Sequence, residues 1–138
     1  MTARGKARKK ALDVLYEADV RGIAAAEVLD AKADAAEVPM NPYTAELVWG
    51  VVEHSDRIDD LLSTYSQGWT LDRMPAVDRN VLRIGVYELL WADDVPDAVA
   101  ISEAVALVQT LSTDESASFV NGLLARILEV KPRLALDG

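Results

Sequence analysis

Hydrophobic residues recur at spacings of three and four along most of the chain, which is the period of an amphipathic α-helix. Proline, glycine and asparagine separate these periodic segments, and no stretch of useful length alternates between hydrophobic and polar residues as a strand does. The first helix is expected over about residues 6–20 and the second over about residues 24–37. The pattern predicts about seven helices with short connections, and therefore an all-α bundle.

Polar residues and prolines at the joints predict where the later helices begin. The break over residues 68–76, where Pro75 disfavours helix, divides the chain into halves of similar length. We expect one domain, residues 1–138, built from two packed subdomains of approximately residues 1–67 and 68–138. The fifth helix is apolar on nearly all sides and is expected at the centre. The expected capping residues are Asn41, Ser55 or Asp56, Asp78, and Thr113 or Asp114.

The composition is that of a folded protein, because 51% of the 138 residues are hydrophobic and 27% are charged. The chain has no cysteine, which excludes disulfides, thiolate metal sites and cysteine nucleophiles. No apolar run approaches the ~20 residues needed to cross a bilayer. Asp13, Glu17 and Asp19 interrupt what would otherwise resemble a signal peptide. We therefore expect a soluble cytoplasmic protein.

The charge is unevenly distributed. The chain carries a formal net charge of −9, yet five cations fall within seven residues near the N-terminus: Arg4, Lys6, Arg8, Lys9 and Lys10. Part of this basic cluster is expected on the first helix, with Arg8 and Lys9 away from its apolar face, and part on a flexible tail before it. Such asymmetry indicates a polyanionic partner. A solubilising, frayed terminus explains the same residues equally well.

No arrangement of residues indicates catalysis. His54 is the only histidine and lies near a helix end, where interaction with the helix dipole is the simpler interpretation. Adjacent acidic residues such as Asp59 and Asp60 point away from each other on a helix, so they do not indicate a metal site. There is no glycine-rich phosphate loop. We expect a non-enzymatic protein without a metal or other cofactor.

Aromatic residues suggest packing first and binding second. Trp49, Trp69 and Trp91 are each expected to pack in the core or between subdomains. Phe119 lies near Ser116 and Asn121 at the start of the last helix, where an RNA base could stack. The residues alone favour the alternative, in which Phe119 anchors the helix.

Four segments, in order and covering most of the chain, together resemble the NusB family of transcription antitermination factors. They are ARKKALDVLYEAD at residues 7–19, VDRNVLRIGVYEL at 77–89, DVPDAVAISEAVAL at 94–107 and SASFVNG at 116–122. Each motif alone is weak, but their order and spacing make the combination specific.

The resemblance implies an all-helical fold of two packed subdomains and a non-enzymatic function. Members of the family bind boxA RNA of nascent ribosomal transcripts jointly with NusE, a small-subunit ribosomal protein. They do so in an antitermination complex that contains RNA polymerase. Two other functions compete: a homodimerising helical scaffold without an RNA role, and the RNA-binding domain of an RNA-modifying enzyme. The latter needs a separate cofactor-binding domain, for which this chain leaves no room. A homodimer could also form through the surfaces that the resemblance assigns to RNA and NusE.

The resemblance also implies site residues. The RNA-binding residues are then Arg4, Lys6, Arg8, Lys9, Lys10, Ser116, Phe119 and Asn121, and stacking by Phe119 becomes the favoured interpretation. The NusE-binding residues are Tyr16, Asp72 and Asp78. We expect the bases to be read at a seam between the first and last helices. If all five cations neutralise phosphates of a single strand, they contribute a log–log salt slope of about −3.5.

Overall fold

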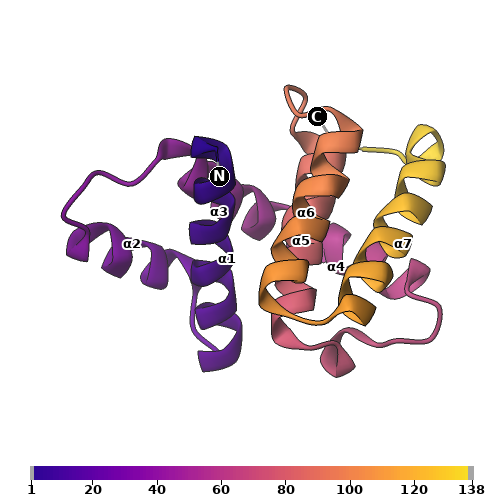
Figure 1. Ribbon diagram of the computed structural model, residues 1–138, viewed down its shortest axis with the longest axis horizontal. Coiled ribbons are helices and arrows are strands. Elements are labelled where there is room, and N and C mark those ends of the chain that lie inside the picture. Colours follow the sequence, from indigo (N-terminus) through magenta and orange to yellow (C-terminus); the bar gives the residue numbers. More distant parts are fainter. Residues whose placement is uncertain (1, 137–138) are drawn as a thin grey trace.

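The structure is a computed structural model that describes residues 2–136, and within that range it is all-helical, as the hydrophobic pattern predicted (Figure 1). Seven α-helices and two 3₁₀ turns follow one another without a strand in the described residues. The helices are α1 (Ala3–Arg21), α2 (Ala25–Ala35), α3 (Pro42–Glu53), α4 (Ser55–Tyr65), α5 (Ala76–Trp91), α6 (Asp97–Leu111) and α7 (Asp114–Val130), and the turns are η1 (Leu71–Arg73) and η2 (Lys131–Arg133). None of these helices combines the length and the apolar character that crossing a bilayer requires.

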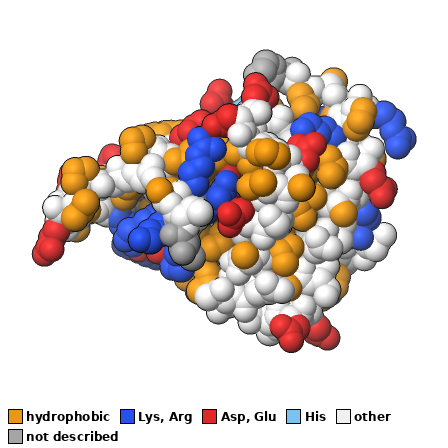
Figure 2. All heavy atoms as spheres, turned by 45° about the horizontal axis from the view of Figure 1, so that its top comes forward, with side chains coloured by type: hydrophobic (Ala, Val, Ile, Leu, Met, Phe, Trp, Pro, Cys, Tyr) orange, Lys and Arg blue, Asp and Glu red, His pale blue; other side chains and the backbone are white. Residues whose placement is uncertain are grey.

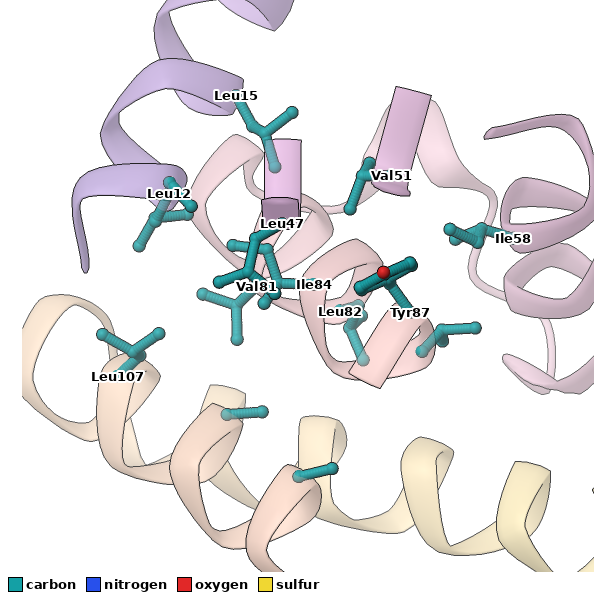
Figure 3. Packing of buried hydrophobic residues seen from close by; sticks show 14 of the residues in the cluster. Leu12, Leu15, Leu47, Val51, Ile58, Val81, Leu82, Ile84, Tyr87 and Leu107 are labelled. Carbon is teal, nitrogen blue, oxygen red and sulfur yellow. The ribbon is translucent and has the colours of Figure 1, made fainter. Parts of the chain in front are cut away.

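Helix α5 is the centre of the molecule, which confirms the expectation from its apolar sequence. It packs against α1, α3, α4, α6 and α7, and most of its side chains are buried. Leu12 from α1 and Leu47 from α3 converge on Val81 and Ile84 of α5 in a continuous core (Figure 3). Burial of these side chains against one helix is the main apolar stabilisation of the fold.

The packing does not simply follow the two halves of the chain. Helices α1, α2 and α3 pack together on one side of α5, while α6 and α7 form an antiparallel pair on the other (Figure 1). Helix α4 precedes residue 67 but packs against α5 and α7. The division into subdomains at residues 67 and 68 therefore stays a prediction about folding units.

Helix α1 begins three residues earlier than the pattern predicted. The Thr2 hydroxyl accepts a hydrogen bond from the Gly5 amide at 2.9 Å, which caps the helix at Ala3. All five N-terminal cations consequently lie on the helix, and the expectation that some occupy a flexible tail is wrong. At the other end, Gly22 adopts a left-handed conformation with φ of 67° and closes the helix.

Two of the expected caps are confirmed. The Asn41 side chain accepts a hydrogen bond from the Tyr43 amide at 2.9 Å, with Pro42 as the first helical residue. The Thr113 hydroxyl accepts one from the Ser116 amide at 3.1 Å. These short polar residues satisfy backbone N–H groups that have no partner within the helix.

The other two expected caps are wrong. Helix α4 starts at Ser55 directly after His54, without a side-chain cap from Ser55 or Asp56. Helix α5 starts at Ala76 after Pro75, so Asp78 is its third residue and only 2% of it is exposed. Pro75 holds φ at −53°, which begins the helix without a polar cap.

A polar network fixes the C-terminal end of α1 to α5 and α4. The Asp19 carboxylate accepts hydrogen bonds from Arg79 at 2.8 Å and Asn80 at 2.9 Å. Arg83 lies between Asp19 and Asp59 of α4 and contacts both carboxylates. Burial raises the pKa of Asp19, but the bonds from Arg79 and Asn80 more than offset this and hold that pKa below its ordinary value.

Helices α3 and α5 approach each other closely at Gly50. A Cβ atom at residue 50 would overlap the ring of Tyr87, which packs directly on the α3 backbone. Glycine is therefore required by contact between helices, since its backbone lies in an ordinary helix.

Candidate nucleic-acid interface

The N-terminal cations lie on three different faces of α1 because an α-helix turns 100° per residue. Lys6 and Lys10 are one turn apart on the same face, and both are exposed. Among the described residues neither amine has a carboxylate partner within ion-pair distance. Both line a groove of about 510 Å³ between α1 and the segment that joins α2 to α3. Within residues 2–136, these two lysines are the cations of the basic cluster that have no acidic partner.

Arg8 is buried, and the expectation that it lies on a polar face of α1 is wrong. Its side chain is 3% exposed, and its Nε and Nη2 atoms donate to the Glu88 carboxylate of α5 at 2.8 and 2.9 Å. Glu103 lies 3.4 Å from Nη1. Burial lowers the pKa of Arg8, but the hydrogen bonds from Arg8 to Glu88 and the negative charge of Glu88 raise it by more. The pKa of Arg8 therefore lies above its ordinary value, and the guanidinium stays charged. Direct contact of Arg8 with RNA would require separating this buried pair.

The same buried carboxylate also holds α3. The Tyr43 hydroxyl donates to Glu88, so α1, α3 and α5 share one polar contact inside the core. Burial and this bond raise the pKa of the Tyr43 phenol well above its ordinary range. Arg8, Tyr43 and Glu88 therefore position the helix that carries the exposed lysines.

Arg4 and Lys9 are partly exposed and paired with acidic residues. Arg4 donates to Asp94 at 2.6 Å and lies over the Tyr43 ring, 4.2 Å from its centre. Lys9 donates to Asp13 one turn further along α1, also at 2.6 Å. Exposed ion pairs contribute only about 0–1 kcal/mol, so a phosphate can replace these carboxylates at little cost. Both residues stay candidates for RNA contact.

The aromatic part of the predicted site lies on α7. Phe119 is partly buried and its ring lies 5.3 Å from the ring of Trp69, centre to centre. Trp69 is expected in the core or between subdomains, but it is 50% exposed, so the expectation of core packing is wrong. Asn121 is exposed nearby in sequence, whereas Ser116 is only 8% exposed and donates to Asp78 at 2.6 Å. The aromatic surface here comprises Trp69 and Phe119, whereas Asn121 is two residues further along α7 and therefore points to a different face of the helix.

The expected seam between the first and last helices is absent. Helices α5 and α6 lie between α1 and α7, which do not form a packed interface (Figure 1). In the view of Figure 1, α1 begins at the upper side of the molecule and α7 begins at the lower side. A narrow groove instead runs between α1 and α6, lined by Gly5, Lys9, Glu103, Ala106, Leu107, Thr110 and Leu111. The basic and aromatic residues therefore form two separate surfaces.

The three residues assigned to NusE differ in accessibility. Tyr16 of α1 is 41% exposed, and Asp72 is exposed in the η1 turn. A hydrogen bond with the Thr70 side chain holds the pKa of Asp72 below its ordinary value. Asp78 is buried against Ser116, so it is not available for direct contact. A charge reversal at Asp78 would disturb the packing of α5 on α7 before it tested any partner surface.

Two surface features were not predicted from the sequence. Lys32 of α2 lines the groove opposite Lys6 and Lys10, but its neighbours Asp30 and Asp34 make that segment acidic. Trp49 is 50% exposed on α3, against the expectation of core packing. Trp91 does pack inward, with its ring stacked on His54 at 4.0 Å between centres. The three tryptophans therefore differ in exposure because their surroundings differ, although their residue type is the same.

The helices of residues 2–136 pack around α5 in an all-α fold, and within those residues Lys6 and Lys10 lie on one exposed face of α1 without an acidic partner, although the chain as a whole is acidic. The chain belongs to the NusB family, whose model matches residues 5–129. It is 67% identical to the transcription antitermination protein NusB of a Nocardioides species, over 98% of this chain and 100% of that protein. It is 60% identical to the transcription antitermination protein NusB of Thermobifida fusca, over 97% and 94% of the two chains.

Solved structures show the same fold. NusB of T. maritima superposes with a TM-score of 0.83 at 32% identity, covering 97% of this chain and 99% of that one. A chain from a crystal structure of the antitermination factors NusB and NusE in complex with double-stranded RNA gives a TM-score of 0.83 at 29% identity, over 94% and 98%. The family resemblance inferred from the four motifs is confirmed.

Proposed function

We propose that this chain is a transcription antitermination factor that binds boxA-type RNA of nascent ribosomal transcripts together with NusE, in a complex with RNA polymerase. The observation that carries the proposal is a pair of exposed lysines, Lys6 and Lys10, without a carboxylate partner in residues 2–136, on a chain 67% identical to a transcription antitermination protein. The related complex of NusB with NusE and RNA supports both kinds of partner.

The geometry suggests how the chain would bind RNA. The net charge of −9 repels a polyanion over most of the surface. Lys6 and Lys10 attract phosphates at one end of α1, and the Arg8–Glu88 pair holds that helix in place. Trp69 and Phe119 offer an aromatic surface for a base at a distance from the lysines. NusE would supply further positive charge, which a predominantly acidic chain accommodates.

Replacing Lys6 and Lys10 together with alanine is expected to weaken binding of single-stranded boxA-type RNA. Each cation that neutralises a phosphate contributes about 0.7 to the log–log salt slope, so the double variant should lower that slope by about 1.4. Fluorescence anisotropy at several salt concentrations measures it. Replacing Arg57 and Arg73, which lie on α4 and η1, removes the same charge elsewhere and should leave the slope unchanged. An equal change in both double variants would contradict a localised site.

NusE is expected to increase the affinity of this chain for boxA-type RNA. The measurement is an RNA titration with and without saturating NusE, and equal affinities would contradict the adaptor function.

Asp72→Lys should reduce the NusE-dependent gain while preserving NusE-free RNA affinity, because Asp72 is exposed in the η1 turn. Self-association through the same surfaces would compete with both partners, and sedimentation of the free chain measures it.

A further inference from the structure

A surface groove lies between α1 and the segment that runs from the end of α2 into α3. Its volume is about 510 Å³. Figure 2 shows Lys and Arg side chains gathered where the projecting α2 segment meets the rest of the molecule. The lining residues are Ala3, Lys6, Ala7, Lys10, Lys32, Ala35, Ala36, Val38, Pro39, Met40, Asn41 and Thr44.

Three lysines from two helices surround this groove. Lys6 and Lys10 lie on α1, about 6 Å apart along the helix axis. Lys32 faces them from α2, and its one ion pair in residues 2–136 is with Glu17 at 3.5 Å. The described residues that line the groove include no carboxylate, although acidic residues dominate the chain as a whole. The groove is therefore a local cationic site that can hold more than one negative charge.

The floor of the groove is apolar. Alanine side chains from both helices and Val38, Pro39 and Met40 form most of its surface. The Thr44 hydroxyl is occupied, since it donates to the carbonyl of Ala7. A peptide laid on this floor would bring backbone N–H and C=O groups that find few partners there, at a cost of ~1–3 kcal/mol for each buried group. The face of a nucleobase has no such requirement.

We infer that the groove between α1 and α2 is the path of single-stranded RNA, with phosphates held by Lys6, Lys10 and Lys32 and one base lying on the apolar floor beside Val38 and Met40. The inference rests on the proposed function and adds Lys32 and the connection between α2 and α3 to the site. The RNA then follows a channel between two helices, with Arg4 and Arg8 on the far side of α1.

Lys32→Ala tests the third cation, and Lys131→Ala is its matched control. Both lysine side chains are 32% exposed and each is paired with one carboxylate, but Lys131 and its partner Asp97 line a different pocket. Lys32→Ala should lower the salt slope for a single-stranded boxA-type oligonucleotide by about 0.7. If the variant and the unmodified chain bind equally at 1 M salt, the variant then binds about fivefold more weakly at 0.1 M salt. Lys131→Ala should leave the slope unchanged.

Ala35→Glu tests the floor, and Ala33→Glu is its control. Both alanines are exposed near the end of α2, but only Ala35 lines the groove. A carboxylate at residue 35 should repel phosphates and cause a larger loss of RNA affinity than Lys32→Ala, while Ala33→Glu should bind like the unmodified chain. Circular dichroism of both variants verifies that α2 stays folded.

The outcomes separate this inference from the proposed function. If the unmodified chain binds RNA and both Lys32→Ala and Ala35→Glu retain its affinity and salt slope, the inference is overturned. An acidic protein segment is then the ligand that fits the cationic groove. If the unmodified chain itself does not bind boxA-type RNA, with or without NusE, the proposed function fails and the inference fails with it. Selective losses in Lys32→Ala and Ala35→Glu support the inference.

Discussion

Arg8→Ala is expected to lower the free energy of unfolding by about 3–5 kcal/mol, because it leaves the Glu88 carboxylate buried without its cation. The side chains of Arg8 and Glu88 are 3% and 1% exposed, so water cannot replace the lost partner. Urea denaturation followed by circular dichroism measures the change. A loss of this size in a chain of this length also predicts a visibly lower melting temperature.

Two controls show whether burial causes the loss. Arg4→Ala removes the exposed pair with Asp94 and should cost at most about 1 kcal/mol. Replacing the whole buried group with apolar residues (Arg8→Met, Glu88→Leu and Tyr43→Phe together) should be much less destabilising than Arg8→Ala, since the only carboxylate that then loses Arg8 is Glu103, which is 33% exposed and can be hydrated. Equal stability of Arg8→Ala and Arg4→Ala would contradict the structural role of Arg8.

Gly50→Ala is expected to destabilise the protein by about 1–3 kcal/mol through overpacking. The added methyl group would overlap the Tyr87 ring at the contact between α3 and α5. This penalty must exceed the gain of ~1 kcal/mol that alanine usually brings to a helix interior. Thermal and urea unfolding measure the difference, and the smaller side chain in Tyr87→Leu should recover part of the loss in the double variant.

Gly122→Ala provides the comparison, because Gly122 also lies within a helix. A Cβ atom at residue 122 would have Nη1 of Arg126 as its nearest neighbour, at an ordinary contact distance of 3.5 Å. Gly122→Ala should therefore stabilise the protein by up to ~1 kcal/mol. If Gly50→Ala were equally stabilising, the close approach of α3 to Tyr87 would be wrong.

Helical periodicity was sufficient to predict the fold class and the central position of α5, because both depend on local patterns of apolar residues. It failed at Arg8. The side chain lies among lysines in sequence, so it was interpreted as a surface cation, but its partner Glu88 is 80 residues away. The available signal was Glu88, the one charge in the apolar C-terminal half of α5 (residues 84–91), because a buried charge requires a counter-charge.

The candidate site was harder to predict because it depends on which helices lie side by side. Motifs on the first and last helices suggested one shared seam, whereas α5 and α6 separate the two helices. Lys32 was missed because Asp30 and Asp34 flank it, and the groove exists only once α1 meets the connection between α2 and α3. Sequence order gives the residues of each helix but not the neighbours of their side chains.

Because Thr2 caps α1, most of the conformational entropy lost when RNA binds is lost by the RNA and not by the protein. A disordered basic tail would lose about 1–2 kcal/mol of backbone entropy for each residue that it ordered on binding. Here Thr2 closes the first turn, so Lys6 and Lys10 are held on a formed helix before any ligand arrives. Most of the ordering on binding then falls on the flexible strand, and base stacking within the free RNA becomes a determinant of its affinity.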